Sequence, residues 1–87
     1  MKKLIREEIF AKIQDILIDR EGIPEEEIVP DAILMKDFKM DSLDIVQMIM
    51  YIEKEFLISI PDSKVYELGK GTVNDLVSYI ENTISTL

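Results

Sequence analysis

A serine between two aspartates is the residue group in this sequence best placed to do chemistry. In the run Asp41-Ser42-Leu43-Asp44, Asp41 is a favoured helix-capping residue, and Asp44, three positions later, can reach back to free backbone amides. We therefore expect Ser42 at the first helical position. The N–H groups and the positive dipole end of a helix start favour an anion, so a phosphodiester on the Ser42 hydroxyl would be well placed.

The helix that follows Ser42 carries apolar residues on two opposite sides when it is wound at the helical period. One side has the three- and four-residue spacings of a face packed into a core: Ile45, Met48, Ile49, Ile52 and Phe56. The second side has Leu43, Val46 and Met50, together with the polar Gln47 and Lys54. We expect this second side to be exposed and to meet another protein beside the serine. A helix buried on both sides is the alternative.

This region resembles the Asp-Ser-Leu signature of acyl carrier proteins. Asp41-Ser42-Leu43 follows a long loop, opens the second major helix, and is followed by Glu53-Lys54-Glu55-Phe56 and then Ile60-Pro61-Asp62. The resemblance covers essentially the whole chain. It implies an all-α four-helix bundle of acyl-carrier type, with three longer helices, one short helix and a long first loop. It also implies a non-catalytic carrier.

By this resemblance, a phosphopantetheinyl transferase would move a 4′-phosphopantetheine arm from coenzyme A onto Ser42, with Asp41 and Leu43 beside it, and make the chain a phosphoprotein. The thiol of the arm would hold acyl intermediates as thioesters. The chain would then carry this acyl cargo between acyl-transfer and chain-elongation enzymes of fatty-acid or related lipid and polyketide biosynthesis.

The resemblance also implies where partners and cargo would bind. Enzymes with basic docking surfaces would meet the second helix, where acids steer and apolar residues pack: Asp41, Leu43, Asp44, Val46, Gln47, Met50 and Glu53. The acyl chain would fold back between the helices, against Ile49, Ile52, Ile60 and Val65.

The sequence departs from the usual carrier pattern near this surface. Lys39 stands where fatty-acid carriers commonly have glycine, two residues before the aspartate of the signature. Gln47 and Lys54 stand where housekeeping carriers present acids, and Tyr51 where a small residue is common. The docking face is therefore less acidic than in the family at large, and a carrier dedicated to a specialised pathway fits this pattern.

The composition favours one small domain that meets basic proteins. The 87 residues suffice for a single modest core, expected as one domain over residues 1–87 and as a monomer. The formal net charge of -8 opposes nucleic acid and anionic lipid surfaces. Without cysteine or histidine, the chain lacks disulfides, thiolate or imidazole zinc ligands and the usual general base.

The beginning of the chain briefly resembles a signal peptide, at Met1-Lys2-Lys3-Leu4-Ile5. Arg6-Glu7-Glu8 then interrupts any apolar core. No segment approaches the length of a membrane span, so we expect no membrane insertion and a cytoplasmic location.

Helical periodicity predicts a first helix from about Lys2 to Arg20, ended by Gly22 in a left-handed conformation. Its core face would comprise Ile5, Ile9, Ile13, Ile16 and Leu17. Pro24 then begins a short acidic turn over Glu25-Glu26-Glu27. The long connection 28–40 is apolar enough to be pinned to the core, and Asp31 could cap a turn around residues 32–35.

The second half of the chain predicts an extended connector over residues 57–60 and then a short helix. Asp62 would cap this helix, which would run from about Ser63 to Leu68 with Val65 and Leu68 inward, before a break at residues 69–71. Thr72 with Asp75 predicts the start of the last helix. The core face of that helix would comprise Val73, Leu76, Val77, Ile80 and Ile84.

Four other interpretations are weaker. A Ser42–Lys39 catalytic pair would need a deprotonated lysine, whereas a solvated lysine beside acids stays charged. The three glutamates at 25–27 diverge on a short turn and suit solvent better than a metal ion. A peptidyl or aminoacyl carrier of a specialised pathway and an unmodified helical adaptor both remain open, although the intact Asp-Ser-Leu run argues against the adaptor.

Overall fold

Helices make up most of the chain. The computed structural model describes residues 4–87. Its elements are α1 (Arg6–Asp19), a single 3₁₀ turn η1 (Glu25–Glu27), α2 (Leu34–Asp37), α3 (Ser42–Phe56), α4 (Asp62–Lys70) and α5 (Val73–Ser85). No strand forms within this range, so the predicted all-α class is confirmed. Four helices have nine or more residues, as expected for the bundle, and the four-residue α2 is an addition, since the sequence predicted only a turn near it.

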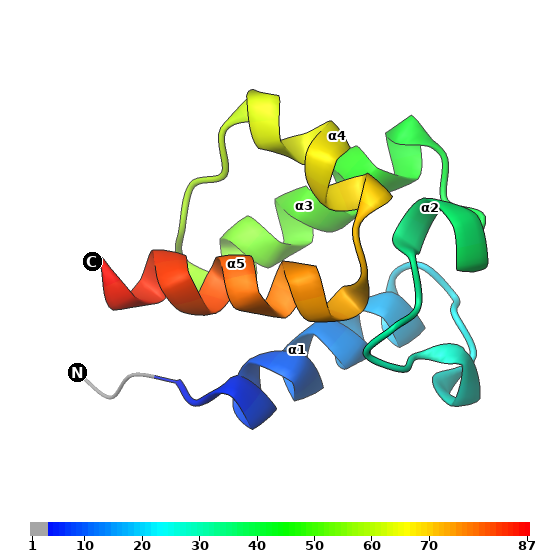
Figure 1. Ribbon diagram of the computed structural model, residues 1–87, viewed down its shortest axis with the longest axis horizontal. Coiled ribbons are helices and arrows are strands. Elements are labelled where there is room, and N and C mark those ends of the chain that lie inside the picture. Colours follow the sequence, from blue (N-terminus) through cyan, green and yellow to red (C-terminus); the bar gives the residue numbers. More distant parts are fainter. Residues whose placement is uncertain (1–3) are drawn as a thin grey trace.

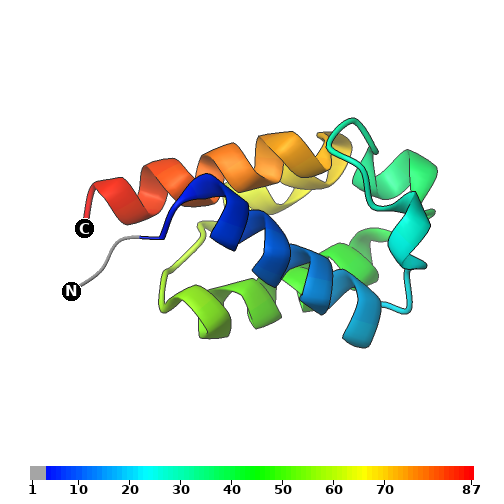
Figure 2. The ribbon, with the colours of Figure 1, turned by 90° about the horizontal axis from the view of Figure 1, so that it is seen from below.

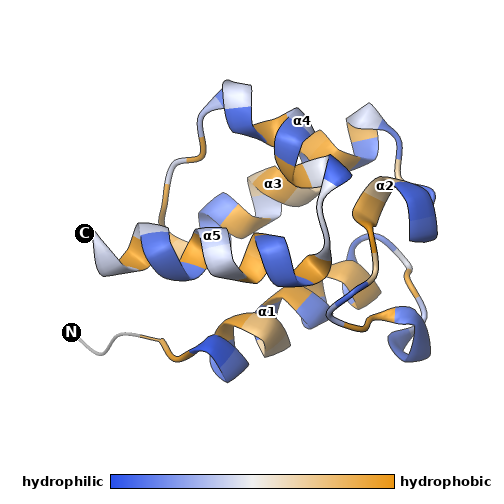
Figure 3. Ribbon diagram, in the orientation of Figure 1, coloured by the Kyte–Doolittle hydropathy of each residue, from blue (hydrophilic) through white to orange (hydrophobic). Residues whose placement is uncertain are grey.

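The arrangement centres on α1, which packs against both α3 and α5 (Figures 1 and 2). α4 packs against α3 and against α2, which closes the end of the bundle where α3 begins. The long helices show hydrophobic and hydrophilic bands (Figure 3), and the hydrophobic bands form the core. This core contains all the predicted inward residues of α3 and, on α5, all but the partly buried Ile84.

The predicted first helix needs correction at its beginning. Lys2, the expected start, lies outside the described residues, and α1 begins at Arg6. Ile5 precedes the helix and is mostly exposed, so it does not belong to the core face, whereas the other four predicted residues of that face are buried. Gly22 is left-handed as predicted, with φ 71°, and the Ile23 N–H donates to the Leu17 carbonyl at 3.0 Å, which closes the helix end.

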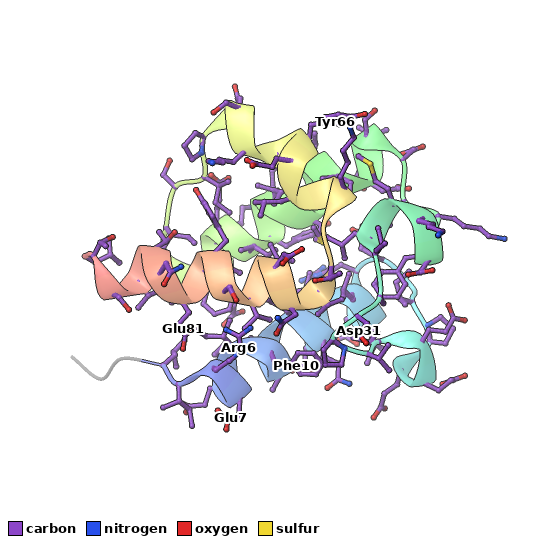
Figure 4. The ribbon with its side chains drawn as sticks, viewed as in Figure 1. Arg6, Glu7, Phe10, Asp31, Tyr66 and Glu81 are labelled. Carbon is purple, nitrogen blue, oxygen red and sulfur yellow. The ribbon has the colours of Figure 1, made fainter. Side chains whose placement is uncertain are left out.

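Arg6 joins α1 to α5 (Figure 4). Its guanidinium donates to Glu81 Oε1 at 3.0 Å, to Ser78 Oγ at 2.9 Å and to the Asn74 carbonyl oxygen at 3.2 Å, and it also contacts the Asn74 side-chain oxygen. One planar cation thus satisfies acceptors on three turns of α5. The contact ties the start of α1 to the first turns of α5.

The long connection before α3 is pinned to the core, as its apolar composition predicted: Ile28, Leu34 and Phe38 are buried. It is also tied by its backbone, which the sequence did not reveal. The Val73 and Asn74 amides donate to the carbonyls of Ala32 and Pro30 at 2.9 and 3.0 Å, and the Leu34 amide donates to the Gly71 carbonyl at 3.2 Å. The start of α5 therefore holds the segment that leads to Ser42.

The predicted capping role of Asp31 is wrong. α2 begins after Ile33, and no side chain caps it at that residue. Instead Asp37, within the helix, reaches back and accepts a hydrogen bond from the Ile33 amide at 2.6 Å. The helix therefore starts two residues later than the expected turn, because the Ala32 carbonyl is already occupied by α5.

The limits of α4 also differ from the prediction. Pro61 occupies the position before the helix, and Asp62 is its first residue rather than its cap. The helix continues through Gly69 and Lys70 and ends at Gly71. Gly69 is closely packed: a Cβ there would lie 2.8 Å from the terminal methyl carbon of Met35 and 3.1 Å from Cγ1 of Ile45. The sequence predicted that the helix would break at Gly69. Instead α4 continues through it, and the absence of a side chain there lets α4 lie close to α2.

Leu57, which ends α3, is held in the left-handed region with φ 55° although 85% of its surface is exposed. A side chain in this conformation costs about 1–2 kcal/mol, and Leu57 regains little of this by burial.

We expect Leu57→Gly to raise the free energy of unfolding by about 0.5–1 kcal/mol. Removing the side chain relieves the strain, and the greater conformational entropy of glycine in the unfolded chain offsets part of that gain. Urea unfolding followed by circular dichroism measures this. Ser59→Gly, in the extended connector, is the matched control and should destabilise; equal effects of both variants would contradict the strain.

Candidate functional site at the start of α3

The first turn of α3 is closed by two reciprocal hydrogen bonds. The Asp44 amide donates to Asp41 Oδ1 at 2.9 Å, and the Asp41 amide donates to Asp44 Oδ2 at 3.1 Å. The predicted capping pair is thus confirmed. Ser42 is the first helical residue, as predicted, and its side chain is exposed. Within residues 4–87 the amides of Ser42 and Leu43 have no acceptor, so they can receive an anion at the serine.

The residues just before Ser42 fix its position. Met40 is buried, which anchors the loop two residues before the serine. Lys39 is exposed and adopts a left-handed conformation with φ 56°. Glycine, which the resembling carriers commonly have here, adopts this conformation without strain, so Lys39 preserves the turn at an energetic cost. Lys39 thus adopts a conformation that glycine would adopt without strain.

The second side of α3 is exposed, so the alternative of a helix buried on both sides is wrong. Leu43 is 64% exposed, Val46 44% and Met50 50%, and Gln47 and Lys54 are exposed as well. We call this set the α3 surface. Large apolar side chains held in water next to a reactive position are typical of a contact site for another protein.

Glu53 and Tyr51 lie differently from the other residues predicted near this surface. The Glu53 carboxylate accepts a hydrogen bond from the Ile60 amide at 2.8 Å, so it ties the connector to α3 and is only partly exposed. Tyr51 is half-buried on the side facing α1, with the Arg20 guanidinium 5.0 Å from its ring centre. Both side chains thus make contacts that hold the fold together, and their positions in the sequence did not indicate this.

A cleft begins at Ser42 and runs along α3 beneath α4. Its volume is about 340 Å³. The walls come from α2, α3, the connector and α4: Met35, Ser42, Ile45, Val46, Ile49, Met50, Glu53, Ile60, Asp62, Val65 and Tyr66. We call this the α3 cleft. Three of the four residues expected around an acyl cavity line the cleft: Ile49, Ile60 and Val65.

Ile52, also expected at the cavity, does not line this cleft. Its side chain is fully buried in the central core. At about 100° per residue, Ile52 is turned about 60° from Ile49 around α3, on the side away from Met50 and Glu53, which line the cleft. Met35 and Tyr66 line the cleft but were not predicted. Met35 belongs to α2, which the sequence did not predict as a helix, and Tyr66 lies beside the predicted inward Val65.

Neither a Ser42–Lys39 pair nor a metal site is formed within residues 4–87. No histidine is present in the chain, and the exposed Lys39 has no hydrogen bond to Ser42 among the described residues. No group of three or more acidic side chains within residues 4–87 is arranged to hold a metal ion, and the glutamates of η1 are exposed. None of the helices in this range has the length and apolar character to cross a membrane.

Comparison with known proteins decides the family. A family model for the phosphopantetheine attachment site matches residues 11–80. The acyl carrier protein of Rubrobacter xylanophilus is 43% identical over 75 residues, which cover 86% of this chain and 90% of that protein. The chain belongs to the acyl carrier protein family. The acyl carrier protein of Thermotoga maritima is similar too, with 38% identity over 79 residues, 91% of this chain and 95% of that protein.

Membership in the acyl carrier family establishes a non-catalytic role. The chain carries acyl groups on 4′-phosphopantetheine and interacts with acyl cargo and with biosynthetic enzymes. When bound, the arm supplies a thiol that holds the acyl group as a thioester. The start of α3 fits such a group, because it combines an exposed hydroxyl, two amides available to a phosphate, and an adjoining cleft.

Glu21 is a residue near this site that the sequence did not single out. Its Oε2 atom is buried and has no hydrogen-bond partner among the described residues. Burial raises the pKa of the Glu21 carboxyl above its ordinary value of 4.5, and the negative charge of Asp44 raises it further. Glu21 follows α1, so the end of that helix places a desolvated acid close to the first turn of α3.

This raised pKa predicts a pH dependence of stability. The folded chain holds the Glu21 proton more tightly than the unfolded chain, so this residue's contribution to stability falls as the pH rises from about 4.5 through the folded pKa. We expect Glu21→Gln to be more stable than the parent at neutral pH and to lose that advantage towards pH 4.5. Urea unfolding across this range measures the difference, with Glu26→Gln in the exposed turn as control. If the difference in stability between Glu21→Gln and the parent did not change with pH, the effect would come from packing and not from the raised pKa.

Proposed function

We propose that Ser42 is the residue that bears the arm, transferred from coenzyme A by a phosphopantetheinyl transferase. The observation that carries this proposal is the placement of the Ser42 hydroxyl: it is exposed, it lies at the first position of α3, and it opens onto the α3 cleft. Ser42 is the sole serine among the residues that line this cleft. The amides of the first turn would receive the phosphate, and Asp41 and Asp44 keep that turn rigid.

Mass spectrometry after incubation with coenzyme A and a broad-specificity phosphopantetheinyl transferase tests the attachment site. We expect one phosphopantetheinyl group on the parent chain and none on Ser42→Ala, because the phosphodiester needs the serine oxygen. Ser63→Ala is a matched control, since Ser63 is also an exposed serine in the first turn of a helix and follows an aspartate. Loading of Ser42→Ala, or failure of the parent chain to load, would refute the assignment.

We further propose that the α3 surface is where enzymes dock. Leu43, Val46 and Met50 would pack against a partner, with Gln47 between them. Asp41 and Asp44 would steer partners with basic surfaces towards Ser42. Glu53 adds less than its sequence position implies, because its carboxylate already accepts the Ile60 amide. Each exposed charge pair contributes only about 0–1 kcal/mol, which suits brief contacts between successive enzymes.

The transferase reaction also tests this electrostatic steering. Removing the Asp44 charge should raise the KM of the transferase by up to about fivefold at low salt, and added salt should reduce the difference. Asp44→Asn is the sharper variant, because an amide oxygen can still accept the Asp41 N–H, whereas Asp44→Lys also removes the cap. If the KM changed neither with salt nor with the Asp44 substitution, electrostatic steering would be contradicted, and docking would depend on the apolar Val46 and Met50.

The α3 cleft is the proposed site for the acyl chain. Its inner walls include Ile49, Ile60 and Val65, which match a hydrocarbon rather than an amino acid side chain. We therefore propose that the chain serves fatty-acid or related lipid and polyketide biosynthesis. The apolar cleft favours this over a peptidyl or aminoacyl carrier. As a separate proposal, the chain works as a single domain in the cytoplasm.

A further inference from the structure

Tyr66 has an unusual position in the α3 cleft. It lines the cleft together with Ser42, yet 58% of its surface is exposed. Val46 and Met50, on α3, are the other lining residues that are both apolar and largely exposed. Ile45, Ile49 and Ile60 are buried and form the floor. The cleft thus has a rim of large side chains from two helices, and Tyr66 is the aromatic member, projecting from α4 in Figure 4.

The Tyr66 ring is held from one side by its own helix. The Lys70 ammonium lies 4.6 Å from the ring centre, and the two residues are one helical turn apart. An exposed cation–π contact of this kind is weakly favourable. This contact limits the positions open to the ring without burying it, so the ring stays available beside the cleft.

We propose that Tyr66 determines cargo retention: its ring covers the hydrocarbon of an acyl chain that occupies the α3 cleft. This inference rests on the proposed function of Ser42 and the cleft. An occupant would bury the exposed part of the ring between itself and Lys70. The favoured cargo is a saturated acyl group long enough to reach the buried apolar floor of the cleft, and an octanoyl group is the probe for it. A two-carbon acetyl group is too short to gain from the ring.

The experiment uses the chain loaded at Ser42 with octanoyl- or acetyl-phosphopantetheine from the corresponding coenzyme A thioesters. Cleavage of each thioester by hydroxylamine is followed by mass spectrometry. Tyr66→Ala should accelerate cleavage of the octanoyl form about two- to tenfold, the factor that corresponds to an aromatic contact of about 0.5–1.5 kcal/mol. The acetyl form should not change, and Tyr66→Phe should behave as the parent because it keeps the ring.

Tyr51→Ala is a matched control, because Tyr51 also lies beside a cation, Arg20, but does not line the cleft. It should leave octanoyl cleavage unchanged under conditions where circular dichroism shows every variant fully folded. Proton NMR adds a readout independent of reactivity: nuclear Overhauser contacts between octanoyl methylene groups and the Tyr66 ring are expected in the parent.

Each outcome separates the two proposals. Normal loading of Ser42 with equal octanoyl cleavage in the parent and Tyr66→Ala would overturn the role of Tyr66 and leave the carrier function intact. Faster cleavage of both the octanoyl and the acetyl form in Tyr66→Ala would also overturn it, since the effect would then not depend on the hydrocarbon. Absence of any loading in the parent would overturn the proposed function itself and the role of Tyr66 with it.

Discussion

The reciprocal capping of α3 by Asp41 and Asp44 is the constraint on which the other features of the site depend. Each carboxylate accepts the backbone amide of the other residue, so the helix can begin only at Ser42. Residues after Ser42 follow at about 100° each, and their apolar spacing determines which side chains of α3 face the core. The capping pair determines that Ser42 is the first residue of the helix, where backbone amides are still available.

A carrier must combine a stable core with contacts that form and break quickly. The core of this chain consists of apolar side chains, and no polar side chain is buried among the described residues. Some of its charged side chains form hydrogen bonds or ion pairs within the fold, and others are exposed to solvent. Glu53 holds the connector, and Glu55 pairs with Lys12 of α1 at 3.0 Å, whereas Lys54 between them forms no ion pair within residues 4–87. Asp41 and Asp44 thus give α3 acidic charge near Ser42, and Lys54 adds an exposed cation near the other end of the helix.

The cleft depends on contacts between segments far apart in the sequence. Hydrogen bonds from the start of α5 hold the loop before α2, and Gly69 lets α4 approach Met35 of that helix. These contacts bring Met35 and Tyr66 to the same cleft as Ser42. The residues that shape the α3 cleft therefore lie partly on α2 and α4, the two shortest α-helices among the described residues, which have the weakest sequence patterns.

Local patterns were enough to predict the long helices, the capping pair, the exposed serine and the two sides of α3. This succeeded because caps and apolar periodicity act within one or two turns of a helix. Local patterns could not predict the late start of α2, the continuation of α4 through Gly69, the internal role of Glu53 or the burial of Ile52 away from the cleft. Each of these depends on a partner from another segment, such as the Gly71 carbonyl or the Met35 side chain, and such partners become neighbours only when the helices pack.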